Sequence, residues 1–350
     1  MRRPHRLCRR HGFSLVELMI AIALGAVLML AVTELATRNS AVRNELQRSA
    51  AQIENGVFAI QQLEQDIANA GFWGETGQPP AVTYDGAQYS ACSTTPPLFV
   101  GTATAPAALG EELRQATCYP VLGGQAPPTP AGLAVKDGTD YLAIRRGSSC
   151  SLDDAGCDPA VPGDVYLQAN ACFEPNVSGA PAPGDLQFST VVAELEFMTR
   201  ACDTVTPVEL APRYRLLSRI YFINDDDQLA RAELSGTGPG AYDTVEALVD
   251  GVEALRLEYG LDNGATTGSF AGDGQVDEYV RTPLGAGWSD VVAVRVFLVV
   301  RSRESSPGHV DNRSYTVAGE SYTVPAAYSD YKRQVFSRTV VLRNVAERRE

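Results

Sequence analysis

Residues 13–33 read Phe13-Ser-Leu-Val-Glu-Leu-Met-Ile-Ala-Ile-Ala-Leu-Gly-Ala-Val-Leu-Met-Leu-Ala-Val-Thr33, and this stretch decides the fold. About 20 almost uninterrupted apolar residues are enough to cross a bilayer as one helix. Five arginines and no acidic residue precede it, in residues 1–12. Because basic residues stay on the cytoplasmic side, they predict a single span, with residue 34 onward on the outer side.

The only charged side chain within this span is Glu17. A carboxylate one turn into a membrane helix is costly, and such residues usually have a function and a partner. A secretory signal peptide is the alternative interpretation, but it would be cut after the apolar run and would not need Glu17. Here the apolar run continues without a break into a further helical pattern, which favours a retained helix.

The run Gly12-Phe13-Ser-Leu-Val-Glu17-Leu, with a basic leader before it and an apolar stretch after it, resembles the processing site of type IV prepilins and type II secretion pseudopilins. The resemblance implies that a prepilin peptidase cuts between Gly12 and Phe13 and that Phe13 is then N-methylated. Glu17 becomes the fifth mature residue, where these families carry a glutamate. In a packed filament Glu17 would pair with the terminal ammonium of a neighbouring subunit, because buried charges need partners.

A second helical segment follows the span. No proline occurs from Phe13 to about Ala70, and Gly71 lies where a helix-ending glycine is expected. We expect a transmembrane half at 13–35 and an amphipathic half at 36–71. The second half carries an apolar stripe with spacings of three and four: Ile53, Val57, Ile60, Leu63 and Ile67. The stripe is too short and irregular for a coiled coil. We therefore expect it to pack on a sheet.

Residues 72–350 predict a β-rich domain. Residues 72–135 are rich in Gly, Pro, Ala and Thr, and we expect long loops there with one or two short strands. Only 244–250 suggest a short helix. The fold class that fits is α+β and pilin-like, a long N-terminal helix packed on an antiparallel β-sheet domain with long disulfide-bearing loops. Strand-like runs occur at 140–145, 164–168, 186–190, 191–199, 213–223, 228–234, 252–260, 291–301, 314–317 and 333–344.

Seven cysteines are present, and loss of Cys8 with the leader leaves an even six. An even set in a loop-rich region suits disulfides in an oxidising compartment such as the periplasm, although free buried thiols are the alternative. Metal binding by these thiols is not expected, because no Cys-x-x-Cys pair occurs and His309 is the only histidine after residue 12. The sequence does not choose among the pairings; short loops favour neighbours, namely Cys92–Cys118, Cys150–Cys157 and Cys172–Cys202.

Charge and motifs argue against two classes of function. Subtracting the five leader arginines from 29 basic residues leaves 24 against 42 acidic residues, a net charge of −18. Such a domain repels nucleic acid, so no nucleic-acid partner is expected. No nucleophile elbow, phosphate-binding glycine loop or His-Glu-x-x-His pair occurs, so no catalytic residues and no enzyme activity are expected.

One acidic loop is a candidate calcium site. Asp262, Asp273 and Asp277 crowd oxygen ligands around glycines, as a calcium loop does. The spacing breaks the twelve-residue EF-hand pattern, however. A solvated hairpin loop is therefore the preferred interpretation.

Four patches along the chain resemble the PilW family of minor pilins: the helix end from Ile53 to Gly74, then 214–222, 248–260 and 336–344. Region 75–210 matches only loosely, and its role stays open. The resemblance implies a minor pilin that primes or supports type IV pilus assembly, near the pilus tip. Two alternatives stay open: a type II secretion pseudopilin of the J class, which is similar but usually shorter, and an adhesive or DNA-uptake pilin.

The same resemblance implies the location and the partners. The chain would cross the inner membrane once, with its C-terminal domain in the periplasm, and would then enter the extracellular pilus. Expected partners are other minor pilins, the major pilin, the prepilin peptidase, the inner-membrane assembly platform and a tip adhesin.

Overall fold

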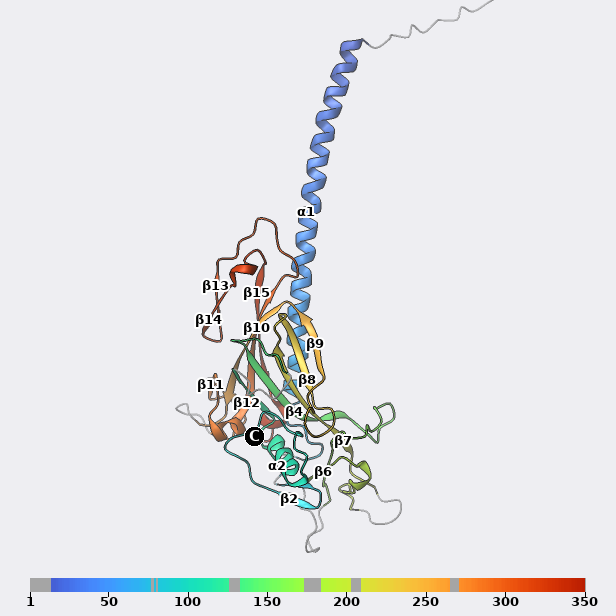
Figure 1. Ribbon diagram of the computed structural model, residues 1–350, viewed down its shortest axis with the longest axis vertical. Helices are drawn as coiled ribbons and strands as arrows, with labels where there is room; N and C mark the ends of the chain where they lie inside the picture. Colours follow the sequence, from blue (N-terminus) through green and yellow to red (C-terminus); the bar gives the residue numbers. More distant parts are fainter. Residues whose placement is uncertain are drawn as a thin grey trace, which may run out of the picture. The chain divides into compact units, whose positions relative to one another are not determined.

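A computed structural model describes residues 14–76, 79, 81–125, 133–172, 184–202, 209–264 and 271–349. The chain divides into two compact units, residues 1–51 and 52–350. In the described part, the first unit contains only the N-terminal portion of a long helix. The second contains the last turns of that helix and every strand (Figure 1).

Helix α1 runs from Leu15 to Ala68, so it begins two residues after the expected start at 13 and ends three residues before the expected end at 71. It contains a segment long and apolar enough to cross a membrane. The helix stops just before Gly71, whose φ of 73° suits a glycine and turns the chain out of the helical path. The Gly71 backbone N–H then donates to the carbonyl of Arg145, at 3.0 Å, so the chain after the helix is tied to the sheet.

In the described part of the chain the larger sheet has nine strands, and all of their pairings are antiparallel except that of β1 with β6. Strand β8 (Gln228–Glu233) pairs with β7 and carries β9 (Val245–Asp250) on its other side. The remaining strands follow in spatial order: β2 (Ala87–Tyr89), β1 (Val82–Tyr84), β6 (Leu186–Ser189), β5 (Tyr166–Ala169), β7 (Arg213–Ile223), β4 (Asp140–Ser151) and β3 (Val121–Gln125).

The second sheet is antiparallel and has four strands in the order β11 (Glu278–Val280), β10 (Val252–Leu261), β12 (Val291–Arg301) and β15 (Arg333–Val341). Strand β12 lies between β10 and β15, so the strand-like run at 291–301 forms a central strand of this sheet. A separate hairpin and short helices complete the described elements: β13 (Ser314–Val317), β14 (Glu320–Thr323), α2 (Pro106–Cys118), α3 (Arg343–Ala346), η1 (Val192–Glu194), η2 (Gly285–Asp290) and η3 (Ala326–Tyr328).

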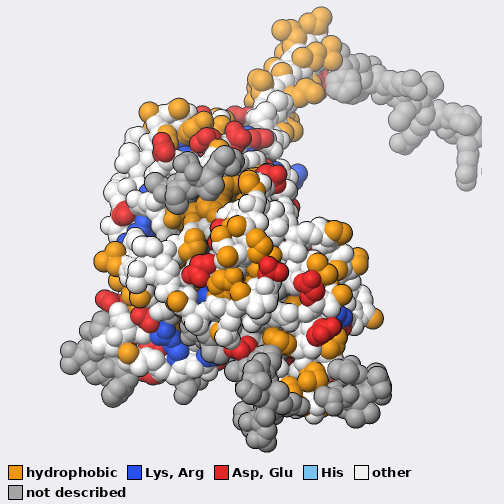
Figure 2. Space-filling model, turned by 60° about the horizontal axis from the view of Figure 1, so that its bottom comes forward, with side chains coloured by type: hydrophobic (Ala, Val, Ile, Leu, Met, Phe, Trp, Pro, Cys, Tyr) orange, Lys and Arg blue, Asp and Glu red, His pale blue; other side chains and the backbone are white. Residues whose placement is uncertain are grey.

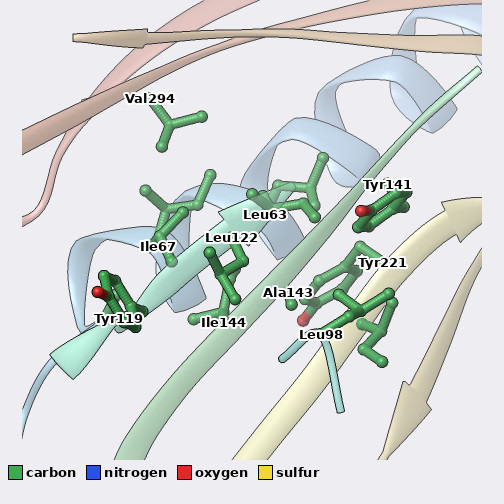
Figure 3. Packing of buried hydrophobic residues seen from close by; sticks show 14 of the residues in the cluster. Leu63, Ile67, Leu98, Tyr119, Leu122, Tyr141, Ala143, Ile144, Tyr221 and Val294 are labelled. Carbon is green, nitrogen blue, oxygen red and sulfur yellow. The ribbon is translucent and has the colours of Figure 1, made fainter. Parts of the chain in front are cut away.

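One hydrophobic core joins the end of α1 to both sheets. Leu63 and Ile67 of α1 are wholly buried. Figure 3 shows them beside Leu122 of β3, Ile144 of β4 and Val294 of β12, which belong to the same cluster. The last turns of α1 are therefore part of the globular core, as expected for a helix packed on sheets.

The buried face of α1 differs in part from the predicted stripe. Leu63 and Ile67 are buried as expected, but Ile53 and Val57 are 45% and 43% exposed. The reason is that polar side chains of α1 form hydrogen bonds with the sheets, so the buried face of the helix contains polar as well as apolar residues. Its buried residues are Gln52, Gly56, Ala59, Leu63, Asp66 and Ile67.

Three local predictions were wrong. Residues 245–250 form strand β9 and not a helix, because they pair with β8. The predicted strand at 191–199 begins with the 3₁₀ turn η1, and Met198 forms only an isolated bridge to Leu210. The loop-rich region 72–135 contains the helix α2, which buries Leu109 and Leu113.

Three disulfides connect residues that are neighbours along the chain. They are Cys92–Cys118, Cys150–Cys157 and Cys172–Cys202, the same pairs that short loops favour in the sequence. The first ties the segment after β2 to the last residue of α2. Loop-rich parts of the domain are thereby cross-linked, which restricts the unfolded chain.

Candidate assembly site

Glu17 lies in the first turn of α1, while Gly12 and Phe13 lie outside the described residues. Glu17 is exposed and makes no hydrogen bond or ion pair with any residue that the structure describes. Its neighbours Leu15, Val16 and Leu18 are more than half exposed. Figure 2 shows hydrophobic side chains covering this part of the helix. Both the apolar surface and the carboxylate therefore need partners from outside the described chain.

The apolar surface of α1 gives way to charged side chains one residue after Thr33. Glu34 accepts a hydrogen bond from Arg38 at 2.5 Å, one turn further along. Before this pair, the Thr33 hydroxyl donates to the carbonyl of Met29 at 2.7 Å, so the helix itself satisfies that polar group. Glu17 is thus the one ionisable side chain in 14–33, in the first turn of an otherwise apolar segment of α1.

A network of buried ion pairs at the other end of α1 was not predicted from the sequence. Asp66 is only 2% exposed. It accepts hydrogen bonds from Arg146 of β4 at 2.9 Å and from Arg219 of β7 at 2.9 and 3.0 Å. The hydroxyl of Tyr221 donates to the same carboxylate at 2.5 Å. One carboxylate on the helix therefore holds two neighbouring strands of the larger sheet.

The electrostatics of Asp66 follow from these contacts. Burial alone would raise the pKa of the Asp66 carboxyl, but Arg219, Arg146 and the Tyr221 hydroxyl outweigh it and lower that pKa below its ordinary value. The network continues outward, because Arg219 also donates to Glu233 at 2.7 Å. The carboxylate is therefore ionised at neutral pH and fully paired.

Two further side chains of α1 contact the second sheet and the residue that precedes β15. The Gln52 amide donates to the carbonyls of Val300, at 2.7 Å, and Lys332, at 3.2 Å. Glu64 pairs with Arg338 of β15 at 2.8 Å. The last turns of α1 are thus clamped to both sheets by polar groups as well as by the core. No local sequence pattern predicts these contacts, because the partners lie more than 75 residues away in the chain.

The acidic loop does not form a metal site among the residues that the structure describes. Asp262 is buried and accepts hydrogen bonds from the backbone N–H groups of Gly272, at 2.6 Å, and Gly274, at 2.9 Å. Asp273 and Asp277 likewise accept backbone N–H groups. Their oxygens organise the described part of the loop itself, so the calcium hypothesis gains no support.

Comparison with known protein families adds two matches. Residues 7–33 match the model of the prokaryotic N-terminal methylation motif. Residues 220–344 match the model of the type IV pilus-assembly protein W, PilW. The chain is therefore similar to the PilW family over its C-terminal part and to the methylation motif at its N-terminal end. The PilW match begins within β7 and includes the whole second sheet, on which part of α1 packs.

The two matched models describe a type IV pilus-assembly protein and an N-terminal methylation motif, and neither description names an enzyme activity. The expected architecture, a long N-terminal apolar helix packed on antiparallel sheets, is confirmed. Among curated proteins, none matches the chain. Among solved structures, a type IV-like pilin from Thermus thermophilus is similar, with 11% identity, coverage of 84% of this chain and 97% of that one, and a TM-score of 0.33.

Proposed function

We propose that this chain is a minor pilin of the PilW family that primes or supports type IV pilus assembly close to the pilus tip. In this proposal the prepilin peptidase cuts between Gly12 and Phe13, Phe13 is N-methylated, and Glu17 pairs with the terminal ammonium of a neighbouring subunit. The observation that carries the proposal is the exposed Glu17, which has no partner among the described residues and lies on an apolar helix segment within the match to the methylation motif.

The proposed location follows from the same end of the chain. Residues 13–35 would cross the inner membrane once, with the leader in the cytoplasm and 72–350 in the periplasm, before the subunit enters the extracellular pilus. The disulfides are compatible with an oxidising compartment. The partners would be other minor pilins, the major pilin, the assembly platform and a tip adhesin.

Surface charge disfavours the DNA-uptake alternative. On the face shown in Figure 2, acidic side chains are scattered among apolar ones, and the basic side chains of the described residues form no continuous groove. A DNA-binding surface needs a continuous positive stripe, because phosphate neutralisation dominates its affinity. The proposal therefore does not include a nucleic-acid partner.

A gene deletion tests the proposal against its nearest alternative. Surface pili would be counted and secreted enzymes assayed in the same cultures. We expect loss of pili, normal secretion, and recovery of pili when the intact gene is returned. Normal pili with failed secretion would instead identify a type II secretion pseudopilin.

Variants returned to the same deletion strain test the role of Glu17. Glu17→Gln removes the charge with little change of shape and is expected to leave the protein processed and membrane-inserted but to abolish recovery of pili. Glu34→Gln is the matched control, because it removes a carboxylate just beyond the apolar segment. Full recovery of pili by Glu17→Gln would refute the charge pairing.

A further inference from the structure

A cavity of about 350 Å³ lies in the globular unit. It is lined by the end of α2, the residue before β3, η2 and the C-terminal segment that begins with α3. Figure 1 shows the C-terminus beside α2. Its lining includes the side chains of Thr117, Pro120, Ser289, Val345, Arg348 and Arg349.

Arg348 is the unusual group in this cavity. One of its terminal nitrogens donates to the carbonyls of Gly71, at 2.9 Å, and Thr76, at 3.2 Å. Within the described chain it forms no ion pair. Burial lowers the pKa of the Arg348 guanidinium to about 10, so it still carries its charge at neutral pH. A partly buried cation that has only neutral partners is costly, and an anion in the cavity would relieve that cost.

Arg349 provides the contrast in the same cavity. It pairs with Asp262 at 3.3 Å and with Asp290 at 3.0 Å, so its charge is already balanced. The hydroxyl protons are also used, because Thr117 donates to the carbonyl of Arg114 and Ser289 to that of Ala286. Among the described residues, the cavity therefore offers one uncompensated positive charge and walls that include the apolar Pro120 and Val345.

We propose that this cavity binds a single carboxylate group, carried on a small side chain or chain end, with Arg348 as its counterion. A guanidinium binds a carboxylate through charge-assisted hydrogen bonds, and it can do so through two of its nitrogens. A phosphate dianion would bring one charge more than Arg348 balances. The C-terminal end of α2 adds a partial negative charge, which a full guanidinium charge outweighs.

The size of the cavity limits the source of the carboxylate. It lies near the lower end of the range for small-molecule sites, about 300–1,000 Å³. That space suits one acidic side chain or the last residue of another chain, or a small free carboxylate. Either source presents the same chemistry to Arg348, and the experiment separates them.

The test uses the full chain in detergent, titrated calorimetrically with three probes at equal ionic strength. These are sodium acetate, the peptide acetyl-Ala-Ala-Ala with a free terminal carboxylate, and the same peptide as its amide. We expect the carboxylate peptide to bind and the amide to show no binding. Tighter binding of the peptide than of acetate indicates a protein carboxylate, and equal affinity indicates a small free one.

Two variants assign the binding to the cavity. Arg348→Gln is expected to weaken binding of the carboxylate at least tenfold. Because Arg348 also holds two carbonyls, Ser289→Phe serves as a second variant that fills the cavity and keeps the guanidinium. The control is Arg343→Gln, which removes an exposed arginine from the same helix α3.

Several outcomes would overturn the proposal. One is no binding of either carboxylate to the wild-type chain, and another is equal binding of the amide peptide. A third is carboxylate binding that both cavity variants leave unchanged. If the probes bind only after Glu350 is deleted, the occupant is the chain's own end, and a site for an outside carboxylate is ruled out.

Discussion

Asp66 illustrates at the scale of one residue how the chain tolerates a charge in its core. Its carboxylate is buried, yet Arg146, Arg219 and Tyr221 satisfy both oxygens. Removal of one partner from a buried ion pair leaves the other charges uncompensated. Such a change is therefore expected to lower the free energy of unfolding by more than the loss of an exposed ion pair does.

We expect Asp66→Asn to lower the free energy of unfolding by about 3–5 kcal/mol. Urea unfolding of the full chain in detergent measures it, with the fluorescence of the buried Trp73 and Trp288 as the signal. The control is Glu64→Gln, which removes the half-exposed pair with Arg338 and should cost about 1 kcal/mol or less. Equal losses in the two variants would show that burial gives Asp66 no special role.

The pH dependence of the same residue follows from its lowered pKa. Because the folded pKa of Asp66 lies below its ordinary value of 3.8, the carboxylate stabilises the fold above that pH, and the stabilisation is lost as pH falls through the folded pKa. The difference in unfolding free energy between wild type and Asp66→Asn should therefore be largest near neutral pH and shrink below about pH 4. A constant difference down to pH 2 would contradict the lowered pKa.

Processing at Gly12 is a prediction about a single peptide bond. Intact mass spectrometry of the membrane-extracted protein should show loss of residues 1–12 and the gain of one methyl group. Gly12→Val should retain the leader, because the proposed peptidase site is lost, while Gly25→Ala, inside the helix, should be processed normally. Cleavage after the apolar run in the wild type would establish a signal peptide instead.

The residues also mark the limit of sequence reasoning. Leu63 and Ile67 were predicted to be buried because their spacing is local information. The burial of Gln52 and Asp66 was not predictable, because their partners are 80 to 280 residues away. The position of Glu17 as the one charge in an apolar segment can be recognised in 21 consecutive residues. The cavity around Arg348 could not be predicted, because it is formed by segments that only folding brings together.

At the scale of elements, long strongly patterned segments were predicted well and short ones were not. Strands β7 and β12 match their predicted limits, since β-branched and aromatic residues fill them. Strand β9 contains good helix formers, but pairing with β8 overrides that propensity. Helix α2 was not predicted, because Pro106 at its first position and Gly110 in its interior are typical of loops. Leu109 and Leu113 nevertheless keep helical spacing.

The contact of α1 with β15 depends on one glycine. A Cβ atom at Gly56 would lie 2.2 Å from the ring of Phe336, so any larger side chain must displace that ring. We expect Gly56→Leu to destabilise the globular unit by about 1–3 kcal/mol, as overpacked cores generally do. Gly25→Leu is the matched control, because nothing lies within 4 Å of a Cβ atom there.

A double-mutant cycle shows whether the clash is the cause. Phe336→Ala alone should destabilise the fold, but in the Gly56→Leu background it should recover part of the loss, because the ring no longer blocks the leucine. Urea unfolding of all four chains measures the coupling. Additive losses would mean that Gly56→Leu acts elsewhere.

For the whole molecule, the functional division of the chain does not coincide with the folding division. The proposed membrane half of α1 ends near residue 35, yet the compact unit begins at Gln52 and includes the last turns of the helix. Those turns supply Leu63 and Ile67 to the core and Asp66 to Arg146. The globular domain is therefore incomplete without them, although a boundary at the end of the helix looks natural in the sequence.

Two truncated chains test this division. A chain that begins at Ser49 keeps every buried residue of α1 and should be soluble, monomeric and cooperative in urea unfolding. A chain that begins at Phe72 loses the helix and leaves Arg146 and Arg219 without their carboxylate, so it should aggregate or unfold without a cooperative transition. Size-exclusion chromatography and tryptophan fluorescence would compare them, since both keep Trp73 and Trp288. An equally stable chain from Phe72 would show that α1 only rests on the sheets and is not part of the core.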